Sequence, residues 1–271
     1  MRLKNYFKRL AGGIFKRNQG MVFYIAYKAS REYKNRGMIS RKLKALGCKR
    51  ICSSFWEVNG HKIDEVLRAV GENQPILLKR TREIRRPEYN NEGNIVDLGS
   101  LIVLTYNAER DENGRVKGLL ARTPYIRLCR SVYAFCQNSR QYDKRGEVSN
   151  VSQILALLRE GEGEAKIFSR MIIMNNSVET IHILLERVRA RITRRTERIL
   201  EGYKILAHSL LNGHTDRKHI IEEEKKLYSE FIALRKMAIF YEKWLRIDLA
   251  GSLMKVYSVI RKLQSLKMRT A

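Results

Sequence analysis

Two short stretches of the chain, Arg50-Ile-Cys-Ser-Ser-Phe-Trp56 and Arg127-Leu-Cys-Arg-Ser-Val-Tyr133, decide the fold. Arg, Cys and Ser fall at the same places in both, and both are rich in the β-branched and aromatic residues that favour a strand. Each is followed by apolar residues at helical spacing: Ile63, Val66, Leu67 and Val70 after the first, and Val151, Ile154, Leu155 and Leu158 after the second. Matches that recur in one order indicate an internal duplication.

Further strands are predicted on either side of each stretch. They are the runs Met21–Tyr27 and Pro75–Ile84 in the first repeat, and Leu101–Tyr106 and Ala165–Met174 in the second. The resulting order of strand, helix, two strands, helix and strand is that of a ferredoxin-like unit. The sequence therefore predicts an α+β protein with ferredoxin-like units at residues 21–86 and 98–176 and a linker at residues 87–97.

The two ends of the chain have a different character. From residue 177 to residue 271, apolar residues recur at three- and four-residue steps and predict an all-α region with a helical hairpin. Asn212-Gly213 should end the first helix of this region. Gly251 should end the second helix, and a third helical segment should follow it. Residues 1–20 contain basic side chains and no acidic one, which predicts a basic N-terminal arm.

Charge is the unusual feature of the composition. The chain has 54 Lys and Arg against 28 Asp and Glu, a formal net charge of +26. Because an excess of this size repels itself in a compact protein, an anionic partner is expected. Nucleic acid is the first choice, since binding it releases condensed counter-ions. An acidic membrane surface and simple solubility are the alternatives, although no apolar run reaches the length of a membrane-spanning helix.

The first unit resembles a protomer of Cas2, the small ferredoxin-like protein of CRISPR adaptation. The resemblance rests on the strand ending in Tyr27-Lys28-Ala29-Ser30, the helix after it, and Leu46-Gly-Cys-Lys-Arg-Ile-Cys-Ser-Ser-Phe-Trp-Glu57. Cas2 proteins typically have a Gly, then basic, apolar and polar residues, then Ser-Val-Phe-Glu at that place. The second unit is similar at residues 127–133. The resemblance implies that one chain imitates a Cas2 homodimer, whose edges and loops bind the backbone of a duplex.

The same comparison predicts a loss of catalysis. Cas2 enzymes that cleave nucleic acid carry an Asp just after the first strand of each protomer to hold a divalent metal, and the matching residues here are Lys28 and Asn107. Lysine cannot ligate Mg²⁺ and asparagine alone is a weak ligand, because hard cations need carboxylate oxygens. We therefore expect no catalytic residue and no bound metal. A displaced metal site would use Glu109 and Asp111.

The four cysteines point away from cofactors. Cys48, Cys52, Cys129 and Cys136 form no Cys-x-x-Cys pair and have no histidine cluster beside them, so zinc is not expected. No phosphate-binding glycine loop is present either. Free thiols fit a reducing compartment, and the apolar stretch near residue 11 is too short for a signal peptide. We expect a cytoplasmic protein without a cofactor.

Three basic groups and Lys28 are the candidate contacts to nucleic acid. Their members are Arg2, Lys4, Lys8, Arg9, Lys16 and Arg17 in the arm; Lys79, Arg80, Arg82, Arg85 and Arg86 at the end of the first unit; and Arg187, Arg191, Arg194, Arg195 and Arg198 on the first long helix. Strand alternation should put Arg80 and Arg82 on one face. The helical set follows three- and four-residue steps, so it should form a ridge that nearby acids cannot neutralise.

Three functions fit these observations. The first is a non-catalytic, Cas2-like scaffold that grips duplex nucleic acid, with DNA favoured over RNA, and docks a protein partner through its C-terminal helices. The second is an RNA- or ribosome-associated factor, for which a basic arm and a helical hairpin are equally suitable. The third is a weak metal-dependent nuclease. Arginine-rich faces favour contact with the backbone over the reading of bases.

Overall fold

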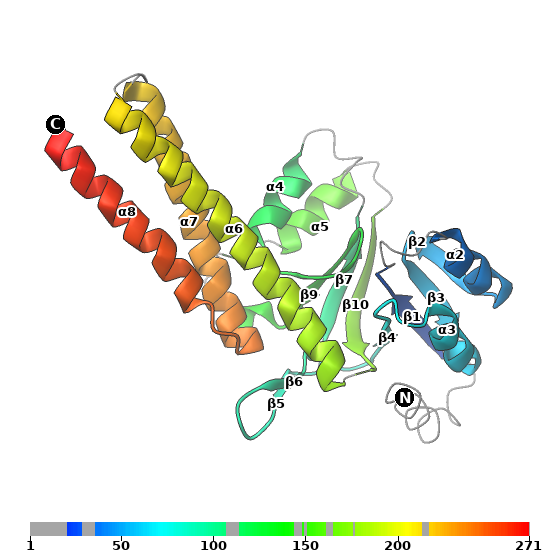
Figure 1. The fold of residues 1–271 in the computed structure, drawn as a ribbon. Coiled ribbons are helices and arrows are strands. Elements are labelled where there is room, and N and C mark those ends of the chain that lie inside the picture. The colour runs from blue at the N-terminus through cyan, green and yellow to red at the C-terminus, as the bar shows by residue number, and fades with distance from the viewer. Residues whose placement is uncertain are drawn as a thin grey trace.

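The computed structural model describes residues 21–28, 36–106, 114–143, 148, 151–160, 165–175, 177–212 and 217–270. Within these residues the chain forms seven α-helices, one eight-stranded antiparallel sheet and a separate two-stranded sheet (Figure 1). The expected α+β class is confirmed, and so is the long helical region after the sheet.

The first half of the large sheet lies between residues 22 and 80. Its elements are β1 (Val22–Ala26), α2 (Arg36–Ala45), β2 (Lys49–Cys52), β3 (Phe55–Asn59), the 3-10 turn η2 (Gly60–Lys62), α3 (Ile63–Val70) and β4 (Ile76–Arg80). The strands lie in the order β2-β3-β1-β4, and each neighbouring pair is antiparallel. The prediction that the last strand continues to Ile84 is wrong, because β4 ends at Arg80.

The second half of the sheet has the same kind of order. Its elements are β7 (Leu101–Thr105), α4 (Arg115–Arg122), β8 (Ile126–Cys129), β9 (Val132–Cys136), the 3-10 turn η4 (Ser139–Gln141), α5 (Val151–Glu160) and β10 (Lys166–Ile173). The strands lie in the order β10-β7-β9-β8. The halves join where β4 and β10 pair antiparallel, with Leu78 opposite Ile173 and Arg80 opposite Met171.

The predicted linker at residues 87–97 contains a small hairpin. It consists of β5 (Glu88–Tyr89) and β6 (Ile95–Asp97). The Tyr89 hydroxyl donates a hydrogen bond to the Trp244 carbonyl at 2.9 Å, so this hairpin is fastened to the helical region.

Three long helices form the C-terminal region: α6 (Val178–Asn212), α7 (Arg217–Leu245) and α8 (Ala250–Thr270). α6 crosses the sheet and contacts both α7 and α8 (Figure 1). The expected break at Gly251 is wrong, since Gly251 lies in the first turn of α8. The chain turns just before it, where Arg246 has a φ of +55° and Asp248 Oδ1 accepts a hydrogen bond from the Ala250 N–H at 2.8 Å.

Side chains of alternating strand positions divide the core between the two faces of the sheet. On one face, Phe23 and Ile25 pack with α2 and α3, while Leu104 and Phe135 pack with α4 and α5. On the other face, the buried strand residues form a single cluster with α6, α7 and α8; from the sheet they include Leu78, Val103 and Ile173. Apolar burial on both faces is the main source of stability in such a layered fold.

The sheet bends at β10, and its two halves also contact each other on the face that α6 covers. The ring of Phe168 in β10 lies 5.1 Å from that of Tyr24 in β1 and 5.6 Å from that of Phe55 in β3, centre to centre. Between Phe168 and Met171 the pairing with β7 shifts register, and Arg170 has a φ of +58°. This bulge bends β10 and so accounts for part of the curvature.

Candidate nucleic-acid interface

Four exposed arginines lie at the end of β4 and in the segment after it: Arg80, Arg82, Arg85 and Arg86. We call residues 80–86 the arginine loop. No hydrogen bond or ion pair joins these four guanidinium groups to any residue that the structure describes. Each is therefore open to an external anion.

The backbone of the arginine loop is held firmly by the second half of the sheet. The Thr81 N–H donates to the Arg170 carbonyl at 2.8 Å, and Arg170 Nη1 donates to the Arg82 carbonyl at 2.9 Å. The Arg85 N–H donates to Ser100 Oγ at 2.8 Å, and the Ser100 N–H returns a bond to the Arg85 carbonyl at 3.0 Å. Because the main chain is already ordered, binding here would cost little backbone entropy.

Gly99 allows this close packing. It has a φ of +69°, a region that L side chains rarely adopt. A Cβ at this position would lie 2.8 Å from the Arg85 carbonyl oxygen and 2.7 Å from the Pro87 nitrogen. Only glycine fits beside the arginine loop without moving its backbone.

Two expectations about this group need correction. Arg80 and Arg82 do not share a face by strand alternation, because β4 ends at Arg80 and Arg82 lies beyond the strand. Lys79 is only partly exposed and faces the opposite side of the sheet, where its Nζ lies 5.6 Å from the centre of the Phe23 ring. Arg170 joins the group instead, as a residue that supports the loop.

The predicted ridge on α6 exposes fewer arginines than expected. Three of its five arginines, Arg187, Arg191 and Arg195, are partly buried and donate hydrogen bonds to other parts of the protein. Arg187 Nη1 donates to the carbonyls of Arg127 and Leu128 in β8, and its Nη2 donates to Gln74 Oε1 at 2.7 Å. Since Gln74 precedes β4, Arg187 ties the first half of the sheet to the second.

Arg191 fastens α6 to the end of α4. Its Nη2 donates to the carbonyls of Leu120 and Thr123 at 3.1 and 3.3 Å, and its Nη1 donates to the Tyr241 hydroxyl at 2.9 Å. Carbonyls in the last turn of a helix lack partners within that helix, and a cationic side chain satisfies them well. This role is structural.

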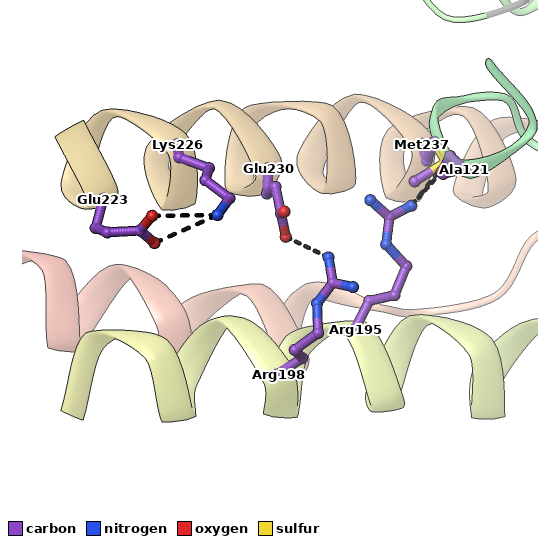
Figure 2. A network of polar contacts seen from close by, with 7 residues as sticks. All are labelled: Ala121, Arg195, Arg198, Glu223, Lys226, Glu230 and Met237. Atoms are coloured by element: carbon purple, nitrogen blue, oxygen red, sulfur yellow. Dashed lines mark hydrogen bonds and ion pairs between the residues drawn. The ribbon is translucent and has the colours of Figure 1, made fainter. Parts of the chain in front are cut away.

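Arg195 and Arg198 lie between α6 and α7, as Figure 2 shows. Arg195 Nη1 donates to the Ala121 carbonyl and contacts Met237 Sδ at 3.6 Å, and burial lowers the pKa of its guanidinium to about 10. Arg198 forms an ion pair with Glu230 of α7. Arg194 is exposed and its Nε donates to the carbonyl of Ala190 in its own helix. The ridge thus offers Arg194 and, in part, Arg198 to solvent.

Lys28 is exposed at the end of β1, and its N–H donates to the Asn73 carbonyl at 2.9 Å. The structure does not describe the arm residues Arg2, Lys4, Lys8, Arg9, Lys16 and Arg17, nor the possible metal ligands Asn107, Glu109 and Asp111. Within the described residues, no three side chains of the His, Cys, Asp or Glu types gather into a possible metal site.

Two further exposed arginines, Arg50 and Arg127, lie in the hairpins β2–β3 and β8–β9 and are absent from the predicted contacts. Arg50 in β2 and Arg127 in β8 each donate Nε to the carbonyl of the cysteine two residues on, at 3.4 Å in both cases. The signal was present, because both arginines belong to the repeated Arg-x-Cys-x-Ser pattern. From the sequence, this repeated pattern was interpreted only as a sign of duplication.

The four cysteines are free thiols, two of them buried. In the described part of the chain no helix is long and apolar enough to cross a membrane. Compared with models of known families, with curated proteins and with solved structures, the chain matches none.

Proposed function

We propose that this protein is a non-catalytic scaffold, similar to Cas2, that binds the phosphate backbone of duplex nucleic acid. In this proposal the two halves of the sheet are ferredoxin-like units in tandem. The strand orders β2-β3-β1-β4 and β8-β9-β7-β10 support it, since each places the first strand of its half between the third and the fourth.

The two hairpins give the duplication its most detailed support. β2 pairs with β3 through Arg50 opposite Trp56 and Cys52 opposite Phe55, with a register shift between them. β8 pairs with β9 in the same way, and its partners are Arg127 opposite Tyr133 and Cys129 opposite Val132. A shared irregularity is stronger support for duplication than a shared strand count, because bulges are specific local features.

The observation that carries the binding function is the arginine loop. Four exposed guanidinium groups lie within seven residues on a backbone that four hydrogen bonds hold in place. Guanidinium groups match phosphate oxygens in geometry and charge, and fixed positions reduce the entropy lost on binding. Contacts of this kind hold a duplex without reading its sequence.

The helical region is proposed to dock a protein partner. Exposed apolar side chains support this assignment: Met254 is 65 % exposed and Tyr257 43 % exposed on α8. We also propose a cytoplasmic location. The free thiols of the four cysteines are consistent with it.

A competition experiment tests the preferred ligand. Labelled duplex DNA would be displaced from the protein by unlabelled DNA and RNA duplexes of matched sequence at moderate salt. The proposal expects DNA to compete better. Stronger competition by folded RNA would favour the RNA- or ribosome-associated factor.

A charge-matched pair of variants tests the site. Replacing Arg80, Arg82, Arg85 and Arg86 together by Ala should weaken binding by more than tenfold, since four phosphate contacts are lost. Replacing four exposed lysines of the helical region, Lys204, Lys225, Lys255 and Lys262, removes the same charge and should weaken it much less. Equal losses would show that net charge alone, and not the arginine loop, drives binding.

The nuclease alternative is tested by incubation with Mg²⁺ or Mn²⁺. The proposal expects no cleavage of single- or double-stranded nucleic acid. Cleavage that Glu109→Gln abolishes would replace the scaffold by an enzyme.

A further inference from the structure

The turns of the two repeated hairpins meet. The Ser54 carbonyl, in the turn between β2 and β3, accepts a hydrogen bond from the Tyr27 N–H at 3.1 Å. The same oxygen accepts one from the Cys129 thiol, at the turn between β8 and β9, at 3.5 Å. We call this contact the hairpin junction. It brings equivalent parts of the two halves together at the end of β1, immediately before the exposed Lys28.

Each hairpin has an arginine at the equivalent position of its first strand, Arg50 in β2 and Arg127 in β8. Arg50 and Arg127 are both exposed, and the bond from each Nε to a cysteine carbonyl holds the guanidinium toward the turn. A guanidinium has five N–H donors, and this bond uses one of them. Within the described chain, the remaining donors of Arg50 and Arg127 have no acceptor. The two guanidinium groups are therefore held in place, that of Arg50 also 5.8 Å from the centre of the Trp56 ring, while their other donors face solvent.

The surroundings of the junction are also positively charged. Arg187 lies directly behind β8, where it donates to the carbonyls of Arg127 and Leu128. Burial raises the pKa of the Cys129 thiol, and the positive charges of Arg187 and Arg127 partly oppose this rise. Both guanidinium groups therefore lie close to the junction. An anion would find positive charge here from both halves of the sheet.

We propose that the hairpin junction is a second phosphate-binding surface, where Arg50 and Arg127 each contact one phosphate of the same duplex. This inference rests on the proposed function and names a separate site for it. Equivalent arginines from duplicated halves suit a duplex, because its two backbones are themselves related by two-fold symmetry. The junction lies near Ile76, at the opposite end of β4 from Arg80, so the two surfaces are about 13 Å or more apart.

The test compares the slope of log affinity against log salt concentration for full-length variants on one DNA duplex. Arg50→Ala and Arg127→Ala should each make this negative slope shallower by about 0.9, and the double variant by about 1.8. Arg50→Lys with Arg127→Lys keeps the charge but loses the Nε bond, so its slope should fall between those of the wild type and the double alanine variant. The control is Arg68→Ala with Arg122→Ala, one exposed arginine from a helix in each half, and it should change the slope by less than 0.5.

The possible failures are distinguishable. If the wild-type protein shows no salt-dependent affinity, the proposed function itself is wrong. If the wild type binds and the arginine-loop variant loses slope, while Arg50→Ala with Arg127→Ala behaves as the control does, then only the hairpin junction is wrong. Circular dichroism of each variant would verify that the fold is retained, as expected for exposed side chains.

Discussion

The guanidinium of Arg191 lies 3.7 Å from the centre of the Tyr125 ring. Tyr125 follows α4, and its carbonyl also accepts a hydrogen bond from the Tyr241 hydroxyl of α7 at 2.7 Å. Arg191 donates to that same hydroxyl. Stacking and hydrogen bonding thus converge on one arginine, which joins α4, α6 and α7.

Arg191→Ala should destabilise the fold by about 3 kcal/mol, because it removes the hydrogen bonds to the Leu120 and Thr123 carbonyls and the cation–π contact with Tyr125. Arg194→Ala is the matched control, since Arg194 is three residues away on the same helix and exposed. It should change the free energy of unfolding by less than about 0.5 kcal/mol. Urea denaturation measures both. Equal effects would contradict the assignment of Arg191 to a structural role.

Gly99→Ala should destabilise the protein by about 3 kcal/mol, because its Cβ would collide with the backbone of the arginine loop at an unfavourable φ. It should also weaken binding to a duplex, since the loop must move. Gly93→Ala has a similar φ of +80° but meets nothing within 4 Å, so strain alone should cost about 1 kcal/mol. A Gly99→Ala protein that binds as tightly as wild type would show that the loop conformation is irrelevant to binding.

Removing Arg187 should loosen the contact between the two halves of the sheet. In Arg187→Ala, Gln74 Oε1 and the Leu128 carbonyl lose their donor, and the stability should fall by about 2 kcal/mol. Amide hydrogen exchange should accelerate in β8 and in the turn before β4. Arg189→Ala is the control, because Arg189 makes only an exposed ion pair with Glu186 and should leave exchange unchanged.

Cys136 should make stability depend on pH in the alkaline range. Burial raises the pKa of its thiol from about 9 to about 12. The folded state therefore keeps a proton that the unfolded state releases, so this contribution is complete below pH 9 and is lost as the pH rises toward 12. Relative to Cys136→Ala, the wild type should lose about 1 kcal/mol of unfolding free energy between pH 9 and 10. Parallel curves for the two proteins would contradict the burial of this thiol.

Local pattern was enough to predict strand structure in Arg50–Trp56 and Arg127–Tyr133, where strand-forming residues surround the repeated cysteine. That each stretch folds back on itself as a hairpin is seen only in the structure. The helix at Ile63–Val70 was equally clear, since its apolar spacing matches the face that is buried. A sequence predicts best those elements whose local conformational preference agrees with their tertiary packing.

Tertiary contacts explain what the sequence analysis missed. The run up to Ile84 has strand-like composition, yet the pairing of β4 with β10 ends at Arg80 and Met171, and the Thr81 N–H bond to the Arg170 carbonyl is the last one before the chain leaves the sheet. Gly251 is a poor helix former, but the chain had already turned at Arg246. Helical spacing placed Arg187, Arg191 and Arg195 correctly along α6. It could not show that carbonyls of β8 and α4 lie opposite them.

The most direct measurement is the salt dependence of duplex binding by the wild type and by the variant lacking Arg80, Arg82, Arg85 and Arg86, between 50 and 200 mM salt. We expect a steep decline of affinity with salt for the wild type and, for the variant, a negative slope that is shallower by about 3.6, which is 0.9 for each lost phosphate contact. A wild-type affinity that is independent of salt, or the same slope for both proteins, would contradict it.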